Sequence, residues 1–131
     1  MALDLLILDT DGYPEMTIPV GIVKHGMLIE LAESIGDFQM ILRMSDYYGD
    51  VEFNVADIPN LLKEFKRLKI EIEENHQIQQ QVANLSNKLM QLEQLSFPPI
   101  TREMLAALLS RLEVLCDIAI REQKSILAQA D

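Results

Sequence analysis

The chain has 131 residues, of which 49% are apolar and 24% are charged, and its formal net charge is −10. This length suits a single domain, and the apolar content excludes an intrinsically disordered chain. The acidic balance argues against nucleic acid and anionic membrane surfaces as partners, because both attract clusters of Lys and Arg.

The negative charge is concentrated in the first part of the chain. Residues 1–60 contain 11 Asp and Glu against Lys24 and Arg43, a net charge of −9, whereas residues 61–131 contain 10 acids against 9 bases, a net charge of −1. Net charge governs steering and association rather than fold. The asymmetry therefore predicts a basic partner for the acidic part.

The chain opens with an apolar run that predicts a first strand. Residues 3–8 are almost all apolar, and the run ends at Asp9-Thr10-Asp11-Gly12, a cluster of turn formers. Residues 16–20 then predict a second short strand. Pro19 would restrict that strand to a sheet edge or a bulge, because proline lacks a backbone N–H.

A helix and two further strands are predicted next. Apolar residues recur at helical spacing from Ile22 to Ile35 and stop at Gly36, a residue type that favours the position just past a helix. Alternation of apolar side chains over residues 38–44 predicts a half-buried strand. Residues 51–53 predict a brief edge strand.

A long helical region follows over about residues 55–95. Asn54-Val55-Ala56-Asp57 resembles a capping box with Asp in place of Glu, and Pro59 falls in the first turn, where its missing N–H does no harm. Two apolar series run along this region, but they are out of phase across residues 73–77. Either two helices meet there, or one long helix turns its apolar face to a new neighbour.

The last part of the chain predicts another helix over about residues 101–123. Pro98-Pro99 ends the preceding helix, and Thr101 is a good N-cap. Residues 125–130 either prolong this helix or return as a final strand beside the first, and we favour the strand. The predicted fold is a single α+β domain, residues 1–131, with a small, mainly antiparallel sheet and three or four helices. Residues 1–54 form its acidic strand/helix/strand part and residues 55–131 its helical part.

Cysteine and histidine give no indication of redox or metal chemistry. Cys116 is the single cysteine, which excludes an internal disulfide, and its place in an apolar helical pattern predicts a buried thiol. His25 and His76 match no metal-ligand or triad spacing, so we expect solvated or capping histidines, no metal and no cofactor. No apolar stretch reaches the length of a membrane span, and we expect a cytoplasmic protein.

One motif carries a resemblance to an enzyme family. Residues 6–12 are similar to the first motif of the haloacid dehalogenase-like phosphatases, an apolar strand followed by Asp-x-Asp-Gly. The resemblance implies a phosphoryl-accepting nucleophile at Asp9 and an acid/base at Asp11. Tyr13 departs from that pattern, and no later acidic pair completes a Mg²⁺ site. The alternative is a strand followed by a hairpin turn, with no catalytic residue.

Residues 45–52 form the predicted binding segment, because carboxylates and tyrosines are concentrated there. Tyrosine supplies a large contact area at low entropic cost, and carboxylates pair with Arg or Lys of a partner. The alternative is that one tyrosine fills the core while the acids stay solvated. The predicted binding residues are Asp46, Tyr47, Tyr48, Asp50 and Glu52.

A wider resemblance covers about the first 70 residues. The opening Leu3-Asp4-Leu5 with Asp9-x-Asp11-Gly12, the segment from Leu42 to Tyr48, and Asp57-Ile58-Pro59 look like a group of small bacterial proteins, some of which resemble toxin-immunity proteins. The resemblance implies a non-enzymatic, immunity-type inhibitor, and the acidic segment at residues 45–52 predicts that it docks on a basic protein. Two alternatives remain: a minimal phosphatase using Asp9 and Asp11, and a homodimer through the glutamine-rich helix at residues 78–92.

Overall fold

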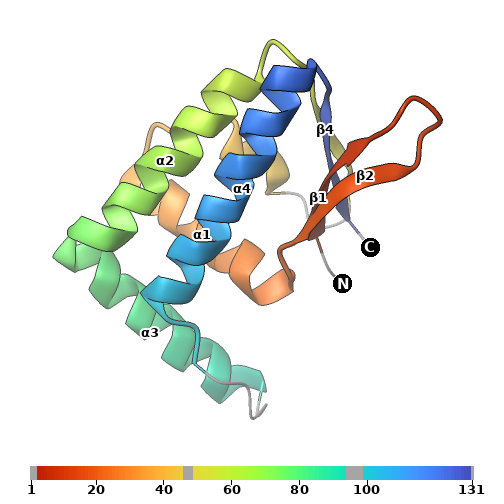
Figure 1. The fold of residues 1–131 in the computed structure, drawn as a ribbon. Helices are drawn as coiled ribbons and strands as arrows, with labels where there is room; N and C mark the ends of the chain where they lie inside the picture. Colours follow the sequence, from red (N-terminus) through yellow and green to blue (C-terminus); the bar gives the residue numbers. More distant parts are fainter. Residues whose placement is uncertain (1–2, 46–48, 94–98, 131) are drawn as a thin grey trace.

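The computed structural model describes residues 3–45, 49–93 and 99–130, without the side chains of residues 89, 90, 92 and 93, and it has the predicted α+β fold (Figure 1). The elements in chain order are β1 (Leu3–Leu8), β2 (Pro14–Pro19), α1 (Ile22–Ile35), the 3₁₀ helix η1 (Ile41–Met44), β3 (Val51–Phe53), α2 (Ile58–Glu74), α3 (His76–Glu93), α4 (Arg102–Glu122) and β4 (Ile126–Ala130). None of the helices in this described part of the chain combines the length and apolar character that crossing a membrane requires.

The four strands form one antiparallel sheet in the order β2-β1-β4-β3. The final strand therefore lies beside the first, as the sequence predicted, and it separates β1 from β3. Across the sheet, Leu6 is opposite Thr17 on one side and Leu127 on the other, and Leu127 is opposite Glu52. Residues from the two ends of the chain thus meet in one row.

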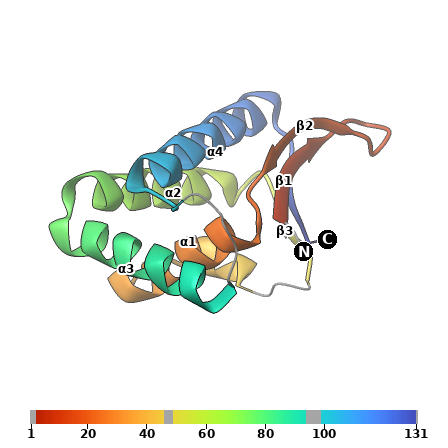
Figure 2. The ribbon, with the colours of Figure 1, turned by 90° about the horizontal axis from the view of Figure 1, so that it is seen from below.

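The two faces of the sheet have different surroundings. The four α-helices lie on one side of it (Figure 2). Leu3, Leu5 and Ile7 of β1 belong to the hydrophobic core on that side. Because successive side chains of a strand point to opposite faces, Leu6 and Leu8 point to the other face. Leu6 is buried, but it is not part of the main core.

Two helices that contribute many core residues, α2 and α4, lie side by side (Figure 1, Figure 2). Each helix buries an apolar stripe at spacings of three and four residues, as predicted. The buried apolar residues of the two stripes are Ile58, Leu61, Phe65, Leu68 and Ile72 on α2, and Leu105, Leu108, Leu109, Leu112, Leu115, Cys116 and Ala119 on α4.

The change of phase at residues 73–77 marks the junction of two helices. Asn75 is the one residue between α2 and α3, and its extended backbone ends the first helix. Its backbone N–H donates to the main-chain oxygen of Glu71 at 2.9 Å, and its Oδ1 accepts from the N–H of Gln77 at 3.0 Å. One asparagine therefore caps the helix behind it and the helix ahead of it.

The predicted strand at residues 38–44 is wrong, because this segment contains η1. Its buried residues are Phe38, Ile41 and Met44, which recur every third position and not every second. Carboxylate oxygens of Glu64 on α2 accept the N–H groups at positions 39, 40 and 41, at 3.2, 2.9 and 2.9 Å. These contacts satisfy the free donors at the start of η1 and fix it against α2.

The predicted end of α1 and start of α4 are confirmed, whereas α2 begins at Ile58 rather than at about residue 55. Asn54 Oδ1 accepts from the N–H of Asp57 at 3.1 Å just before α2, and Thr101 Oγ1 accepts from the N–H of Met104 at 3.2 Å at the start of α4. Gly36 closes α1 with a φ of 88°, a conformation that costs glycine little.

Candidate binding surface

Two of the five predicted binding residues lie within the described part of the chain. Asp46, Tyr47 and Tyr48 lie outside the described residues. Asp50 and Glu52 are described, and both are exposed at the β3 edge of the sheet.

Asp50 has a structural contact. Its Oδ1 accepts the backbone N–H of Ala130 at 2.9 Å, which ties the loop before β3 to the end of β4. A carboxylate that accepts a backbone N–H contributes to stability as well as to surface charge. We therefore assign Asp50 mainly to holding the edge of the sheet.

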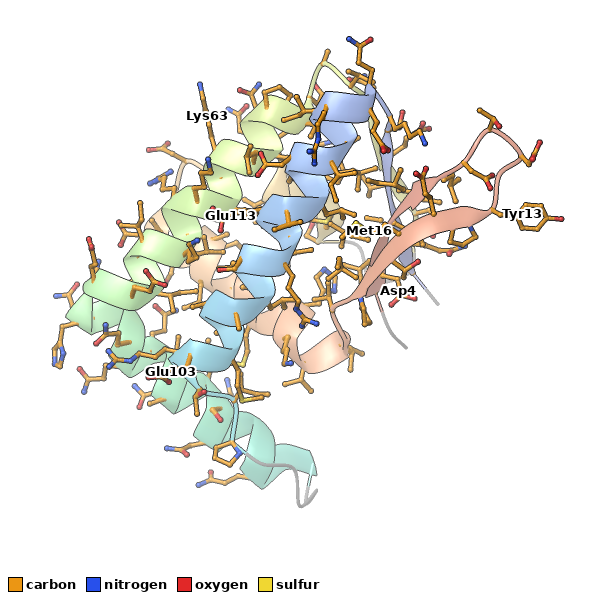
Figure 3. All side chains as sticks on the ribbon, in the orientation of Figure 1. Asp4, Tyr13, Met16, Lys63, Glu103 and Glu113 are labelled. Atoms are coloured by element: carbon orange, nitrogen blue, oxygen red, sulfur yellow. The ribbon has the colours of Figure 1, made fainter. Side chains whose placement is uncertain are left out.

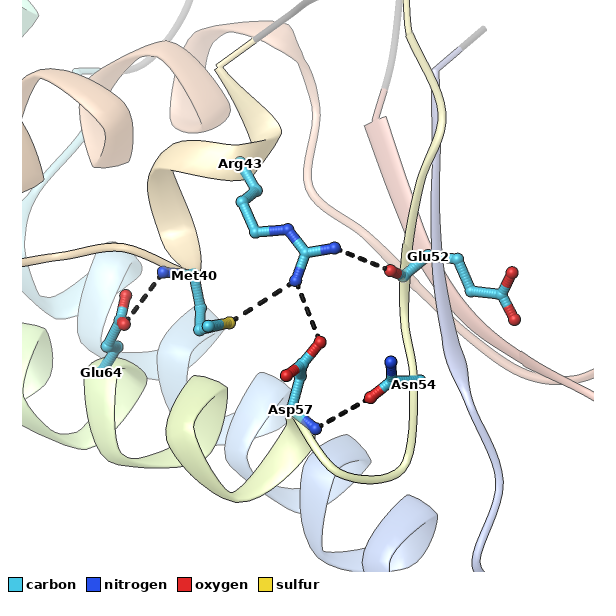
Figure 4. A network of polar contacts seen from close by, with 6 residues as sticks. All are labelled: Met40, Arg43, Glu52, Asn54, Asp57 and Glu64. Atoms are coloured by element: carbon cyan, nitrogen blue, oxygen red, sulfur yellow. Dashed lines mark hydrogen bonds and ion pairs between the residues drawn. The ribbon is translucent and has the colours of Figure 1, made fainter.

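Glu52 has an exposed side chain. It lies in the middle of β3, and its side chain shares a hollow of the sheet surface with Leu127. Figure 4 shows its carboxylate pointing away from Arg43 and its main-chain oxygen pointing toward it. The Glu52 carboxylate has no hydrogen-bond or ionic partner among the described residues.

Glu52 is part of a larger surface on the side of the sheet away from the helices. We call this surface the open sheet face and define it by Asp4, Leu6, Leu8, Asp9, Glu52 and Leu127. Three leucines form its centre: Leu6 is buried, and Leu8 and Leu127 are partly exposed. Asp4 lies toward one end of β1, Asp9 follows the other end, and Glu52 lies at the β3 edge.

A hollow lies at the end of this face nearest the β1–β2 hairpin. Leu8 and Leu127 contribute its apolar surface, and Asp9 and Glu52 contribute carboxylates; Thr10, Lys124 and Ser125 complete the lining. The hollow contains a cation of its own, but Lys124 Nζ is paired with Glu15 and lies 3.5 Å from Glu122 Oε2.

The Asp-x-Asp-Gly motif forms the turn of this hairpin. Asp9 Oδ1 accepts the N–H groups of Asp11 and Tyr13, both at 2.9 Å, and Gly12 adopts a φ of 84°. An aspartate that accepts backbone N–H groups a few residues ahead is typical of a turn. Among the described residues, no group of three His, Cys, Asp or Glu side chains is arranged to hold a metal ion.

Tyr13 projects from the tip of the hairpin (Figure 3). Its side chain is 70% exposed, the largest exposure among the large hydrophobic residues that the structure describes. The sequence pattern pointed to the two adjacent tyrosines, Tyr47 and Tyr48, and not to Tyr13. Its position directly after a glycine turn between two strands was the signal that could have identified it, because such a residue lies at a hairpin tip.

Both edges of the sheet are closed to an added strand. β2 has proline at each end and a register shift opposite Leu8, and such features prevent regular pairing. At the other edge, Arg43 Nη2 donates to the outward-facing main-chain oxygen of Glu52 at 3.2 Å (Figure 4). Regular strand pairing is therefore hindered at both edges of the sheet.

The remaining singled-out residues lie away from this surface. Of the two roles predicted for the histidines, solvated or capping, His25 has the second: it is buried, and its Nε2 lies 2.6 Å from the main-chain oxygen of Met44. That contact places it at the end of η1, where it serves as a cap. His76 is exposed at the start of α3. Cys116 is buried, as predicted, and desolvation raises its pKa to about 12.

The chain matches no protein-family model, no curated protein and no solved structure. Its function has therefore to be inferred from the shape, charge and contacts of the open sheet face.

Proposed function

We propose that the chain is a non-enzymatic protein-binding module that docks the open sheet face on a basic partner, with an immunity-type inhibitor as the most concrete form. The observation that carries the proposal is the uncompensated Glu52 carboxylate beside the apolar Leu8 and Leu127, with Asp9 across the same hollow. An apolar centre with charges at its rim is the usual composition of a protein interface.

The positions of the acidic residues limit which of them can belong to the proposed interface. The acids of residues 1–60 do not form one patch, because Glu30 and Glu33 lie exposed on α1 and Asp57 is paired with Arg43. Asp9 and Glu52 line one hollow, and Asp4 lies on the same face of the sheet, opposite Gln129. The proposed interface is therefore smaller than the charge asymmetry alone suggests.

Charge also supports a basic partner over a second copy of this chain. The whole chain carries −10, so it repels a copy of itself and attracts a cationic surface over distances near the Debye length. Two open sheet faces brought together would place like charges opposite each other. A cationic partner would instead associate faster at low salt than at high salt.

A homodimer through α3 is the second candidate. Gln77, Gln80, Asn84 and Asn87 are exposed on this helix and carry no charge, so these side chains add no like-charge repulsion of their own. Light scattering over a range of protein concentrations tests it. A monomer at every concentration would exclude the homodimer and leave the main proposal unaffected.

The main proposal is tested with matched charge reversals. The partner is captured from native lysate at low salt, purified, and titrated with three proteins: the wild type, Asp4→Lys/Glu52→Lys, and the control Glu30→Lys/Glu33→Lys. Both variants change the net charge equally. We expect affinity to fall about tenfold or more for the first variant and several-fold less for the control, since direct charge pairs contribute more than distant ones. Equal losses for both variants would contradict the proposal.

A further inference from the structure

We infer that the hollow between Asp9 and Glu52 receives a long cationic side chain, arginine or lysine, from the basic partner. This inference rests on the proposed function and names the chemistry of the group that the surface recognises. The hollow combines an apolar lining, two carboxylates and two hydroxyl groups within one site.

The lining matches the two parts of such a side chain. Leu8 and Leu127 can contact its methylene groups, because Lys and Arg cover apolar surface with their aliphatic stems. Its charged end can then pair with the Glu52 carboxylate, and the hydroxyls of Thr10 and Ser125 can accept further hydrogen bonds. A guanidinium has more donors than an ammonium and would use these acceptors more completely.

The local charges leave room for an added cation. Lys124 lies in the hollow, but its Nζ is held by Glu15 and neighbours Glu122, so its charge is already compensated. Oδ1 of Asp9 accepts the two amides of the turn, while Asp9 Oδ2 and the Glu52 carboxylate have no partner among the described residues. The two acids that face the hollow are therefore available to a ligand.

Other occupants fit less well. An acidic side chain would meet Asp9 and Glu52, and an uncharged apolar one would desolvate both carboxylates with no compensating charge. A second copy of the open sheet face would bring the same two acids. A cation with an aliphatic stem satisfies the apolar and the charged parts together.

The test uses the ¹⁵N-labelled full chain and small probes. N-acetyl-arginine amide, N-acetyl-lysine amide and the neutral, similarly shaped N-acetyl-citrulline amide are each titrated at low salt while backbone amide shifts are recorded. We expect saturable shifts at Thr10, Glu52 and Leu127 with the two cations and none with citrulline. The arginine and lysine arms together show which cation the hollow prefers. Shifts of equal size with citrulline would overturn the inference.

Two variants distinguish binding of the cation in the hollow from its general attraction to an acidic protein. Glu52→Gln keeps the shape of the side chain and removes its charge, and Glu33→Gln makes the same change on α1. The arginine affinity should fall about two- to fivefold for Glu52→Gln, the size of a solvent-accessible ion pair, and stay near wild type for Glu33→Gln. Equal weakening by both variants would overturn the inference. An otherwise unchanged spectrum confirms that Glu52→Gln is folded.

The outcomes also distinguish this inference from the proposed function. If the charge reversals abolish binding of the captured partner while neither cation changes the amide shifts of the hollow residues, the inference fails and the proposed function stands. If the cations change the amide shifts of the hollow residues while the charge reversals leave partner affinity unchanged, the proposed function fails and a cation-binding hollow remains.

Discussion

The guanidinium of Arg43 binds the main-chain oxygen of Glu52 at 3.2 Å, from the side of β3 that faces away from β4 (Figure 4). The same guanidinium pairs with Asp57 Oδ2 at 3.2 Å and lies 4.9 Å from the centre of the Phe53 ring. One side chain thus joins η1, β3 and the start of α2, and it occupies the acceptor that a neighbouring strand would need.

Replacing Arg43 by Ala should therefore open the β3 edge. We expect concentration-dependent self-association, measured by sedimentation, together with a loss of about 1 kcal/mol in the free energy of unfolding from the lost ion pair and ring contact. Arg111→Ala is the control, because Arg111 is exposed and has no ionic partner among the described residues. An Arg43→Ala protein that stays monomeric at all concentrations would refute the role of Arg43 at the edge.

The ion pair between Lys69 on α2 and Glu113 on α4 should be sensitive to loss of one partner. Glu113 is only 8% exposed, and Lys69 Nζ lies 2.5 Å from its Oε2. Lys69→Met leaves a largely buried carboxylate without its cation, so we expect a loss of about 1–3 kcal/mol in the free energy of unfolding. The double variant Lys69→Met/Glu113→Leu should recover most of this lost free energy of unfolding.

Urea unfolding of the single and double variants measures this difference. Lys63→Met is the matched control, since Lys63 is exposed on the same helix and has no ionic partner among the described residues (Figure 3). A double variant no more stable than Lys69→Met would show that the cost comes from packing rather than from an unpaired charge.

Stability should fall as the pH is lowered toward mildly acid values because of His25. Burial lowers the pKa of His25 below its ordinary value of 6.5, and the hydrogen bond with the Met44 oxygen offsets this in part. The unfolded state then binds a proton at a higher pH than the folded state. The free energy of unfolding should therefore decrease as the pH falls through 6.5 and level off below the folded-state pKa, with a slope of at most about 1.4 kcal/mol per pH unit.

Urea midpoints between about pH 7 and about pH 5.5 test this, because ordinary carboxyl groups titrate at lower pH. His25→Gln should flatten the pH dependence, and His76→Gln, which changes an exposed histidine, should leave it unchanged. A wild-type slope that survives in His25→Gln would assign the effect to another group.

Cys116 should be unreactive in the folded protein. Its pKa of about 12 and its burial leave almost no thiolate near neutral pH. A thiol reagent should modify one group per chain in denaturant and almost none in its absence. Rapid modification of the native protein would mean that α4 opens locally at little cost.

The helices and the sheet could be predicted where local pattern decides the structure. The helix Ile22–Ile35 ends at Gly36, and Thr101 caps α4, because capping depends on neighbouring residues. The final strand was predicted from the polar break before Ile126.

The features that could not be predicted from the sequence depend on contacts between distant residues. The segment at residues 38–44 has alternating apolar residues, but its backbone donors are satisfied by Glu64, more than 20 positions away. The capping partner of His25 could not be identified either, because the oxygen of Met44 is 19 positions away in the sequence. Neither contact can be predicted from a short segment of the sequence.

The candidate surface was only partly predictable for the same reason. Glu52 was chosen for its acidic neighbourhood, yet Leu8, Asp9 and Leu127 join it only through the register of β1, β4 and β3. Asp4 was visible as a single acid in an apolar run, and the alternation of a strand would have placed it on the face opposite Leu3 and Leu5.

The most direct test of the open sheet face is the association rate constant with the captured partner, measured by stopped flow at several salt concentrations. The wild type should associate fastest at low salt and slow steeply as salt rises, whereas Asp4→Lys/Glu52→Lys should associate slowly with a shallow salt dependence. If both proteins associate at the same rate with the same salt dependence, the open sheet face is not where the partner docks.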